Sequence, residues 1–155
     1  MVNDTQKYLC EYIQQSVNNH PLLSGEIIFK YSTINKPGSI SILIEDFFLL
    51  HNIQTSPQKY LITETDKTSA IQSIRYGLSI KANYTKTDHP FSESEGNQLI
   101  YSFLQLFHNP SFFTIDAKVY QTPLNLEDFW ECGGSIVVDK TGIGLLWIND
   151  LYNKF

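Results

Sequence analysis

The four residues 145–148, Leu-Leu-Trp-Ile, constrain the fold more than any other segment of the chain. Successive side chains of a β-strand point to opposite faces of its sheet, so a run of four large apolar residues makes both faces apolar. Such a strand needs neighbouring strands on either side and packing layers on both faces. We therefore expect residues 145–148 to lie inside a sheet that helices cover, at least in part, on both faces.

The same strand belongs to a predicted β-hairpin over residues 129–150. Residues 139–142, Asp-Lys-Thr-Gly, have the composition of a turn, and we expect the glycine to take the left-handed conformation that closes a type I turn with a bulge. This register points Ile136 and Val138 to one face of the sheet and Val137 to the other.

Apolar residues that recur at intervals of three and four predict helices in other parts of the chain. Small polar residues, proline and glycine near their ends supply start and stop signals. The expected helices cover residues 4–17, 40–50, 66–77 and 95–107. The second has an alternative, because Ile40, Ile42 and Ile44 alternate as in a strand; we favour a helix, since the apolar pattern continues to Leu50.

Short β-branched and aromatic segments predict the remaining strands. Besides the hairpin, the expected strands cover residues 26–32, 78–84 and 111–120. Residues 56–63 stay open, because Ser56-Pro57 can begin a helix while 59–63 also suits a strand.

The polar segment 85–96 predicts a loop. Helices and strands are mixed along the chain rather than strictly alternating. We therefore expect one α+β domain spanning residues 1–155, with a mostly antiparallel sheet.

Composition and charge exclude several classes of protein. Hydrophobic residues make up 42% of the chain and charged residues 17%, so we expect an ordered core. A net charge of −5 disfavours binding to nucleic acid or anionic lipid and favours a basic partner. The chain shows no secretory signal and no run of about 18 apolar residues. We expect a cytoplasmic protein that binds neither nucleic acid nor membrane.

Residues that commonly carry chemistry form no recognised motif. Cys10 and Cys132 have no closely spaced second ligand, and the glycines at 133–134 and 142–144 lack the other residues of a phosphate loop. These glycines suit a strand bend, a close backbone approach and a turn. The four histidines are His20, His51, His89 and His108. No two of them have the i, i+4 spacing of a helical zinc site. We predict no metal, cofactor or catalytic residue.

Acidic residues are concentrated around the hairpin. Residues 121–150 contain five carboxylates and one lysine, a net charge of −4. We expect Asp128, Trp130 and Asp150 to lie near the open end of the hairpin, where an aromatic anchor within an acidic rim suits a protein interface. The predicted contact residues are Glu127, Asp128, Trp130, Glu131, Asp139 and Asp150.

In this hairpin, and in its small size, acidic charge and lack of catalytic motifs, the chain resembles bacterial toxin-immunity proteins. The resemblance implies a cytoplasmic protein that binds a cognate toxin domain, often a basic nuclease, and blocks its active site or an adjacent surface. Because immunity proteins differ widely in fold, the resemblance implies no role for an individual residue. Two alternatives stay open: a small enzyme whose active site is dispersed along the sequence, and an accessory domain that forms oligomers.

Overall fold

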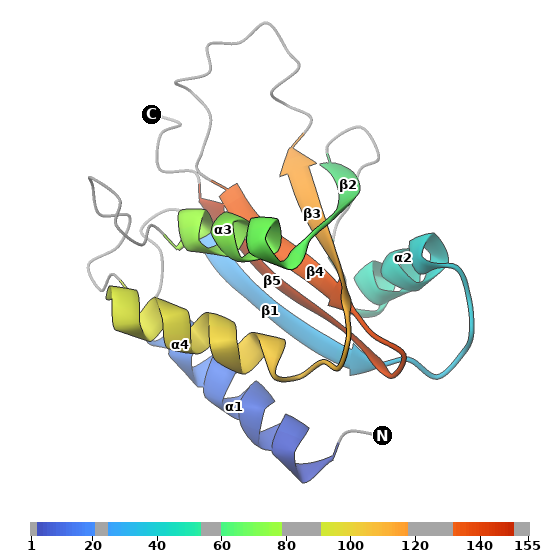
Figure 1. Ribbon diagram of the computed structural model, residues 1–155, viewed down its shortest axis with the longest axis horizontal. Coiled ribbons are helices and arrows are strands. Elements are labelled where there is room, and N and C mark those ends of the chain that lie inside the picture. The colour runs from blue at the N-terminus through green and yellow to red at the C-terminus, as the bar shows by residue number, and fades with distance from the viewer. Residues whose placement is uncertain (1–2, 21–24, 54–59, 79–90, 118–131, 151–155) are drawn as a thin grey trace, which may run out of the picture.

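The computed structural model describes residues 3–20, 25–53, 60–78, 91–117 and 132–150, which form helices packed on an antiparallel sheet (Figure 1). The helices are α1 (Asp4–Asn18), α2 (Ile40–Leu50), α3 (Lys67–Gly77) and α4 (Glu93–Leu104). The strands are β1 (Gly25–Thr33), β2 (Tyr60–Thr65), β3 (Ser111–Ala117), β4 (Cys132–Val138) and β5 (Gly142–Asp150).

All five strands pair antiparallel in the order β1-β5-β4-β3-β2, which confirms the predicted α+β class. The hairpin of β4 and β5 pairs Val138 with Ile143, and β5 pairs along its other edge with β1, from Gly25↔Asp150 to Thr33↔Gly142. Residues 145–148 therefore have a strand on either side, as their sequence predicts.

Side-chain caps determine where the helices begin. Asn3, Ser39, Asp66 and Ser92 each accept a hydrogen bond from a backbone amide of the following turn. The predicted loop over residues 85–96 extends too far, because its last residues belong to α4 and to the cap of that helix. Ser92 and Glu95 form a reciprocal capping box, so the helix begins at Glu93, and Phe91 before it is already buried. Residues 85–90 lie outside the described residues.

The two open alternatives are now decided. Residues 40–50 form a helix, and Tyr60–Thr65 forms a strand. One predicted helix ends earlier than expected: α4 ends at Leu104 and continues as tighter turns to Phe107. The strand β3 is described as far as Ala117, and the rest of the predicted strand over 111–120 lies outside the described residues. The predicted strand over 78–84 lies outside the described residues except Leu78, which caps the end of α3.

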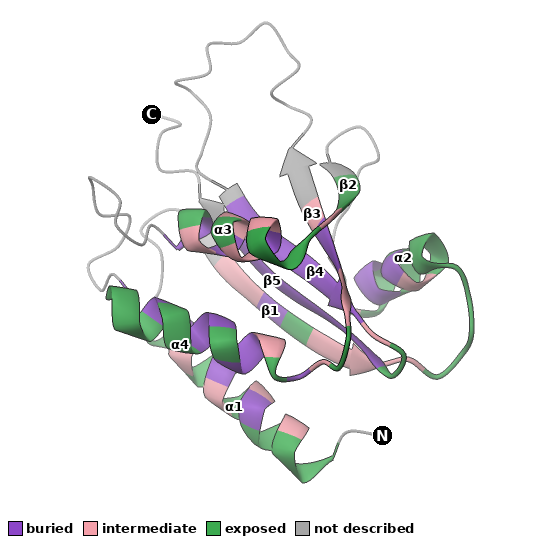
Figure 2. Ribbon diagram, viewed as in Figure 1, coloured by how far each residue is buried: buried purple, intermediate pink, exposed green. Residues whose placement is uncertain are grey.

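The larger core lies between the sheet and the layer formed by α1, α3 and α4 (Figures 1 and 2). Its centre is Phe103 of α4, which is fully buried and meets Phe29 of β1 edge-on, with ring centroids 6.0 Å apart. Leu146 and Ile148 of β5 and Val137 of β4 face this layer.

The smaller core lies on the opposite face of the sheet, under α2. Ile44, Phe47 and Phe48 of α2 pack there with the second set of hairpin side chains. That set is Ile136, Val138, Ile143, Leu145 and Trp147. The hairpin is thus apolar on both faces, as predicted, and helices lie on both.

The pair Gly133-Gly134 lets α3 approach β4 closely, as its sequence predicts. A Cβ atom on Gly133 would overlap the carbonyl oxygen of Ser73, and Gly134 has a φ of 151°. The Gly134 amide donates to the Ser73 hydroxyl at 3.0 Å. Only glycine fits this contact between helix and strand.

None of the helices in the described ranges combines the length and the apolar character required to cross a membrane.

Candidate functional site

The predicted acidic rim does not form a single patch in the described part of the chain. Asp139 lies at the turn of the hairpin and Asp150 at its open end, with the whole of β5 between them. An extended strand of this length spans about 26 Å. The other four predicted contact residues, Glu127, Asp128, Trp130 and Glu131, lie outside the described residues, so their grouping with Asp150 stays a prediction.

Asp139 stabilises the turn. One carboxylate oxygen accepts hydrogen bonds from the Thr141 and Gly142 amides at 2.8 Å, and the other accepts from the His108 amide at 2.9 Å. Gly142 does not have the left-handed conformation expected for it; glycine is needed because a Cβ there would overlap the Tyr31 hydroxyl. The Asp139 carboxylate therefore links the hairpin to the segment after α4.

Beside this turn, two potential nucleophiles are held in their neutral forms. Burial, together with the nearby Asp139 and Cys10, raises the pKa of Tyr31 to about 12. Burial and Glu11 raise the pKa of the Cys10 thiol. Gln6 donates a hydrogen bond to the Tyr31 hydroxyl at 3.1 Å. Because the thiolate is the reactive form, this environment suits packing between α1 and β1 better than nucleophilic chemistry.

Each described histidine lies near the end of an element. His20 stacks on Phe91 with ring centroids 4.0 Å apart and lies 3.3 Å from Glu95. His51 follows α2, and its buried Nε2 atom has no hydrogen-bond partner among the described residues. Those residues include no group of three His, Cys, Asp or Glu side chains positioned to hold a metal ion.

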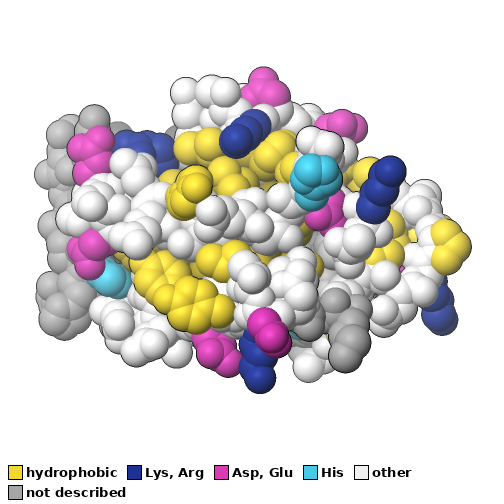
Figure 3. Space-filling model, turned by 60° about the horizontal axis from the view of Figure 1, so that its bottom comes forward, with side chains coloured by type: hydrophobic (Ala, Val, Ile, Leu, Met, Phe, Trp, Pro, Cys, Tyr) yellow, Lys and Arg dark blue, Asp and Glu magenta, His cyan; other side chains and the backbone are white. Residues whose placement is uncertain are grey.

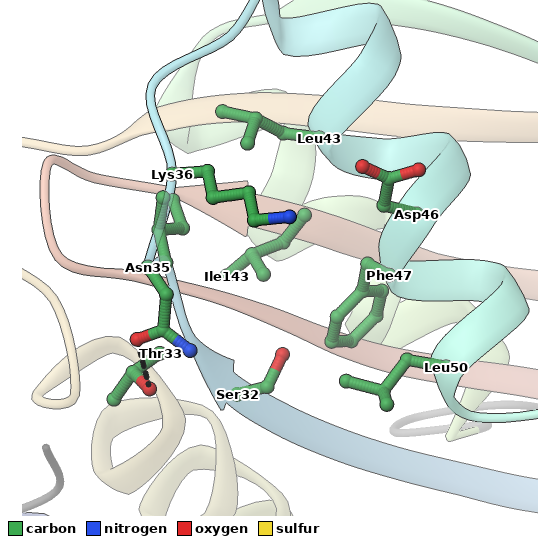
Figure 4. Close-up of a pocket in the computed structure, with 10 residues that line it drawn as sticks. Ser32, Thr33, Asn35, Lys36, Leu43, Asp46, Phe47, Leu50 and Ile143 are labelled. Atoms are coloured by element: carbon green, nitrogen blue, oxygen red, sulfur yellow. Dashed lines mark hydrogen bonds between the residues drawn. The ribbon is translucent and has the colours of Figure 1, made fainter.

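The most distinctive surface of the described residues is an open groove beside α2, with a volume of about 370 Å³ (Figure 4). One wall is α2, and the other is the end of β1 with the segment that follows it. The lining residues are Ser32, Thr33, Ile34, Asn35, Lys36, Leu43, Asp46, Phe47, Leu50 and Ile143. We call this the α2 groove.

The helix that forms this wall carries large apolar side chains on its outer side as well as on its buried side. Ile44, Phe47 and Phe48 anchor it on the sheet, yet Ile42, Leu49 and Leu50 remain 54%, 71% and 67% exposed. A surface helix ordinarily places polar side chains opposite its buried face. The outer side of α2 therefore has a composition typical of a contact surface.

Opposite charges lie on the two walls of the groove. Lys36 extends from the segment after β1 toward α2, where Asp46 lies (Figure 4). Neither side chain forms an ion pair with a residue that the structure describes. Asp46 and Glu45 are the only charged residues of α2. Both groove charges are thus available to a bound molecule.

A second region of exposed hydrophobic side chains lies on the face formed by α1 and α4 (Figure 3). Its most exposed members are Tyr8 and Tyr101, whose hydroxyl groups can bond to water. Leu49 and Leu50 have no such polar atom. The α2 surface is therefore the stronger candidate for a contact with another molecule.

Sequence reasoning missed this surface, although it contains a signal. The apolar stripe of Ile40, Ile44 and Phe47 correctly predicts the helix, but Ile42 and Leu49 lie off that stripe.

No protein-family model, curated protein or solved structure is significantly similar to this chain. The described side chains are therefore the basis for assigning a function.

Proposed function

We propose that this protein is an inhibitory binding protein of the immunity type, which binds a cognate bacterial toxin domain and neutralises it. The observation that carries the proposal is the exposed apolar side of α2 beside an open groove. Uncovered leucine and isoleucine side chains that lie together on a surface commonly mark a site of protein contact.

The surroundings of the groove favour a protein over a small molecule. A small ligand inside the groove would leave Ile42 and Leu49 in water, because neither lines it. A protein surface placed across α2 would cover both side chains and the groove together. Burial of this apolar area would contribute to affinity at roughly 25 cal/mol per Å² before the costs of association.

The charge of the chain favours a basic partner. The net charge is −5, and Asp46 brings a carboxylate to the groove itself. Nuclease toxins carry basic surfaces that bind phosphates, and an acidic inhibitor of such a surface would associate faster through electrostatic attraction. The acidic residues predicted around 127–131 lie outside the described residues and stay a separate prediction of contact with the same basic partner.

Co-production with toxin domains encoded near this chain in its source genome tests the proposal. We expect the full chain to restore growth of bacteria that produce one such domain and to elute with it as a complex. The variant Leu50→Asn should protect less well, whereas Tyr101→Asn on α4 should protect as the wild type does. Failure of the wild-type chain to protect against any of these domains, or to bind one, would overturn the proposal.

A further inference from the structure

We infer that the α2 groove binds an amphipathic helix of the partner, which inserts an apolar side chain beside Leu50 and places a lysine or arginine against Asp46. This inference rests on the proposed function, because it specifies how the same surface recognises its partner.

The dimensions of the exposed surface suit contact with about two turns of a helix. From Ile42 to Leu50 the axis of α2 rises about 12 Å, and its outer side chains recur at helical spacing. Side chains in such rows interdigitate with those of a second helix. The backbone amides of α2 are bonded within the helix, so this wall offers side chains and no open strand edge for pairing.

The groove supplies a place for one anchoring side chain. Phe47 and Ile143 are buried and lie within it, while Leu50 at its border is largely exposed. An apolar side chain inserted there would extend the core beneath α2 and cover Leu50. Anchors of this kind contribute most of the energy in many helix-in-groove complexes.

The position of Asp46 identifies the charge of the partner. Asp46 is separated from Ile42 and from Leu50 by four residues each, so the carboxylate lies between exposed apolar side chains on the same side of α2. A partner that covers both apolar residues must also cover Asp46, and a basic group there compensates for the lost water. Lys36 on the opposite wall can receive an acidic residue of the partner.

The same carboxylate disfavours a second copy of this chain as the occupant. Asp46 lies near the middle of α2, so two α2 helices that cross at their centres around a two-fold axis would bring Asp46 against Asp46. Like charges at such a contact are destabilising. A basic partner avoids this repulsion.

Two stapled helical peptides of 14 residues provide a test that needs no knowledge of the toxin. Positions 1, 5, 8 and 9 of each peptide form one face of its helix. Both peptides have leucine at positions 1, 8 and 9. Position 5 is arginine in one peptide and glutamate in the other. Titration of each into isotopically labelled full-length protein, followed by amide NMR, reports where the peptide binds and how tightly.

We expect the arginine peptide to shift the amide signals of Leu43, Phe47 and Leu50 and to bind about 5–10-fold more tightly than the glutamate peptide. The variant Asp46→Asn should reduce that preference to less than about 3-fold. Glu45→Gln is the matched control, because Glu45 is adjacent in sequence but does not line the groove, and it should retain most of the preference. Unchanged thermal midpoints would show that both variants are folded.

The inference would be overturned if neither peptide shifted groove signals, if both bound equally well, or if Asp46→Asn had no effect on the preference. Sedimentation of the protein alone gives an independent check. A dimer that dissociates on Leu50→Asn substitution would assign the groove to a second copy instead. Peptide binding at the groove without protection from any toxin would refute the immunity function while supporting this mode of recognition. Protection that is unaffected by Leu50→Asn and Asp46→Asn would support the immunity function while refuting this mode of recognition.

Discussion

The two faces of the sheet are covered in different ways. In the described part of the chain, one face packs against three helices and buries sixteen core residues, whereas the other packs against α2 and buries nine (Figure 2). The helix α4 on the first face is amphipathic, with polar side chains toward water. The helix α2 on the second face is apolar toward the sheet and exposes Ile42, Leu49 and Leu50 to water beside Glu45 and Asp46.

This difference separates residues that stabilise the fold from residues available for contact. On the three-helix face, the aliphatic and phenylalanine side chains of α1 and α4 are buried or half-buried by other parts of the same chain, and the large exposed hydrophobic side chains of these two helices are Tyr8 and Tyr101. On the α2 face, Leu49 and Leu50 add little to folding because they remain mostly in water. A side chain that is apolar and yet contributes little to stability is a sign of a second role.

Truncation of a central phenylalanine on each face of the sheet should have the largest effect on the free energy of unfolding. We expect Phe103→Ala to lower the free energy of unfolding by about 3–5 kcal/mol, since the side chain is fully buried. Phe47→Ala should cost about 2–3 kcal/mol, because Phe47 borders the α2 groove and water can enter the space it leaves. Urea denaturation of both variants measures the difference. Equal costs would mean that the two cores are equally closed to solvent.

A methyl group at the contact between α3 and β4 should give the next largest effect. We expect Gly133→Ala to lower the free energy of unfolding by about 1–3 kcal/mol, because the new Cβ forces the strand and the helix apart. Gly38→Ala is the matched control, since a Cβ there meets only ordinary contacts at 3.8 Å or more, and it should change stability by less than about 0.5 kcal/mol. A tolerated Gly133→Ala would show that the three-helix face is less tightly packed than described.

Loss of the Asp139 carboxylate tests whether this residue supports the fold. We expect Asp139→Ala to cost about 1–2 kcal/mol, because the amides of Thr141, Gly142 and His108 lose their acceptor. Asp139→Asn keeps one acceptor oxygen and should cost less. A thermal midpoint unchanged by Asp139→Ala, combined with weaker binding to a toxin domain, would return Asp139 to the predicted contact surface.

The α2 face should respond to mild acid through His51. Burial, together with the nearby Lys30, lowers the pKa of His51 below its ordinary value of 6.5. The folded protein then binds this proton less tightly than the unfolded chain does, so the stability is complete above about pH 6.5 and falls as the pH drops through the folded-state pKa. Denaturation at several pH values should show this loss in the wild type and a smaller one in His51→Gln.

The acidic caps titrate in a lower range and serve as an internal reference. Hydrogen bonds from the Ser69 and Ser92 amides lower the pKa values of Asp66 and Glu95 below 3.8 and 4.5, respectively. Their contribution is present above these ordinary values and is lost in stronger acid. If the stability of the wild type and of His51→Gln changed with pH in the same way above pH 5, the role given to His51 would be wrong.

Replacement of the exposed leucines of α2 should have the smallest effect on stability. We expect Leu49→Asn and Leu50→Asn each to change the free energy of unfolding by less than about 0.5 kcal/mol, because both side chains are mostly exposed. Thermal denaturation monitored by circular dichroism checks this. A loss above 1 kcal/mol would mean that these residues belong to the core of the α2 face.

Most of the fold could be predicted from local patterns. The spacing of Leu99, Ile100 and Phe103 predicts α4, and the apolar run in β5 predicts an internal strand with both faces covered. These predictions succeeded because burial repeats with the period of the element. Where a helix carries apolar side chains on its exposed side as well, as α2 does, periodicity no longer separates the two sides clearly.

The remaining errors concern contacts that are distant in sequence. The need for glycine at 142 comes from Tyr31, more than a hundred residues earlier, and not from the conformation of the turn. The acidic rim was predicted from the density of carboxylates along the chain. That density does not give distances in space: Asp139 lies at the other end of β5 from Asp150, and the grouping of Asp128 and Trp130 with Asp150 stays a prediction.

The pairing of β1 with β5 also limits when the fold can be completed during protein synthesis. Each residue of β1 meets a partner that is added to the chain 109 to 125 positions later. At the usual rates of translation, β1 must wait about 5–25 s for that partner to emerge from the ribosome. Throughout this interval the apolar faces of β1 and α2 lack the hairpin on which they pack, so the nascent chain should depend on chaperones until β5 is made.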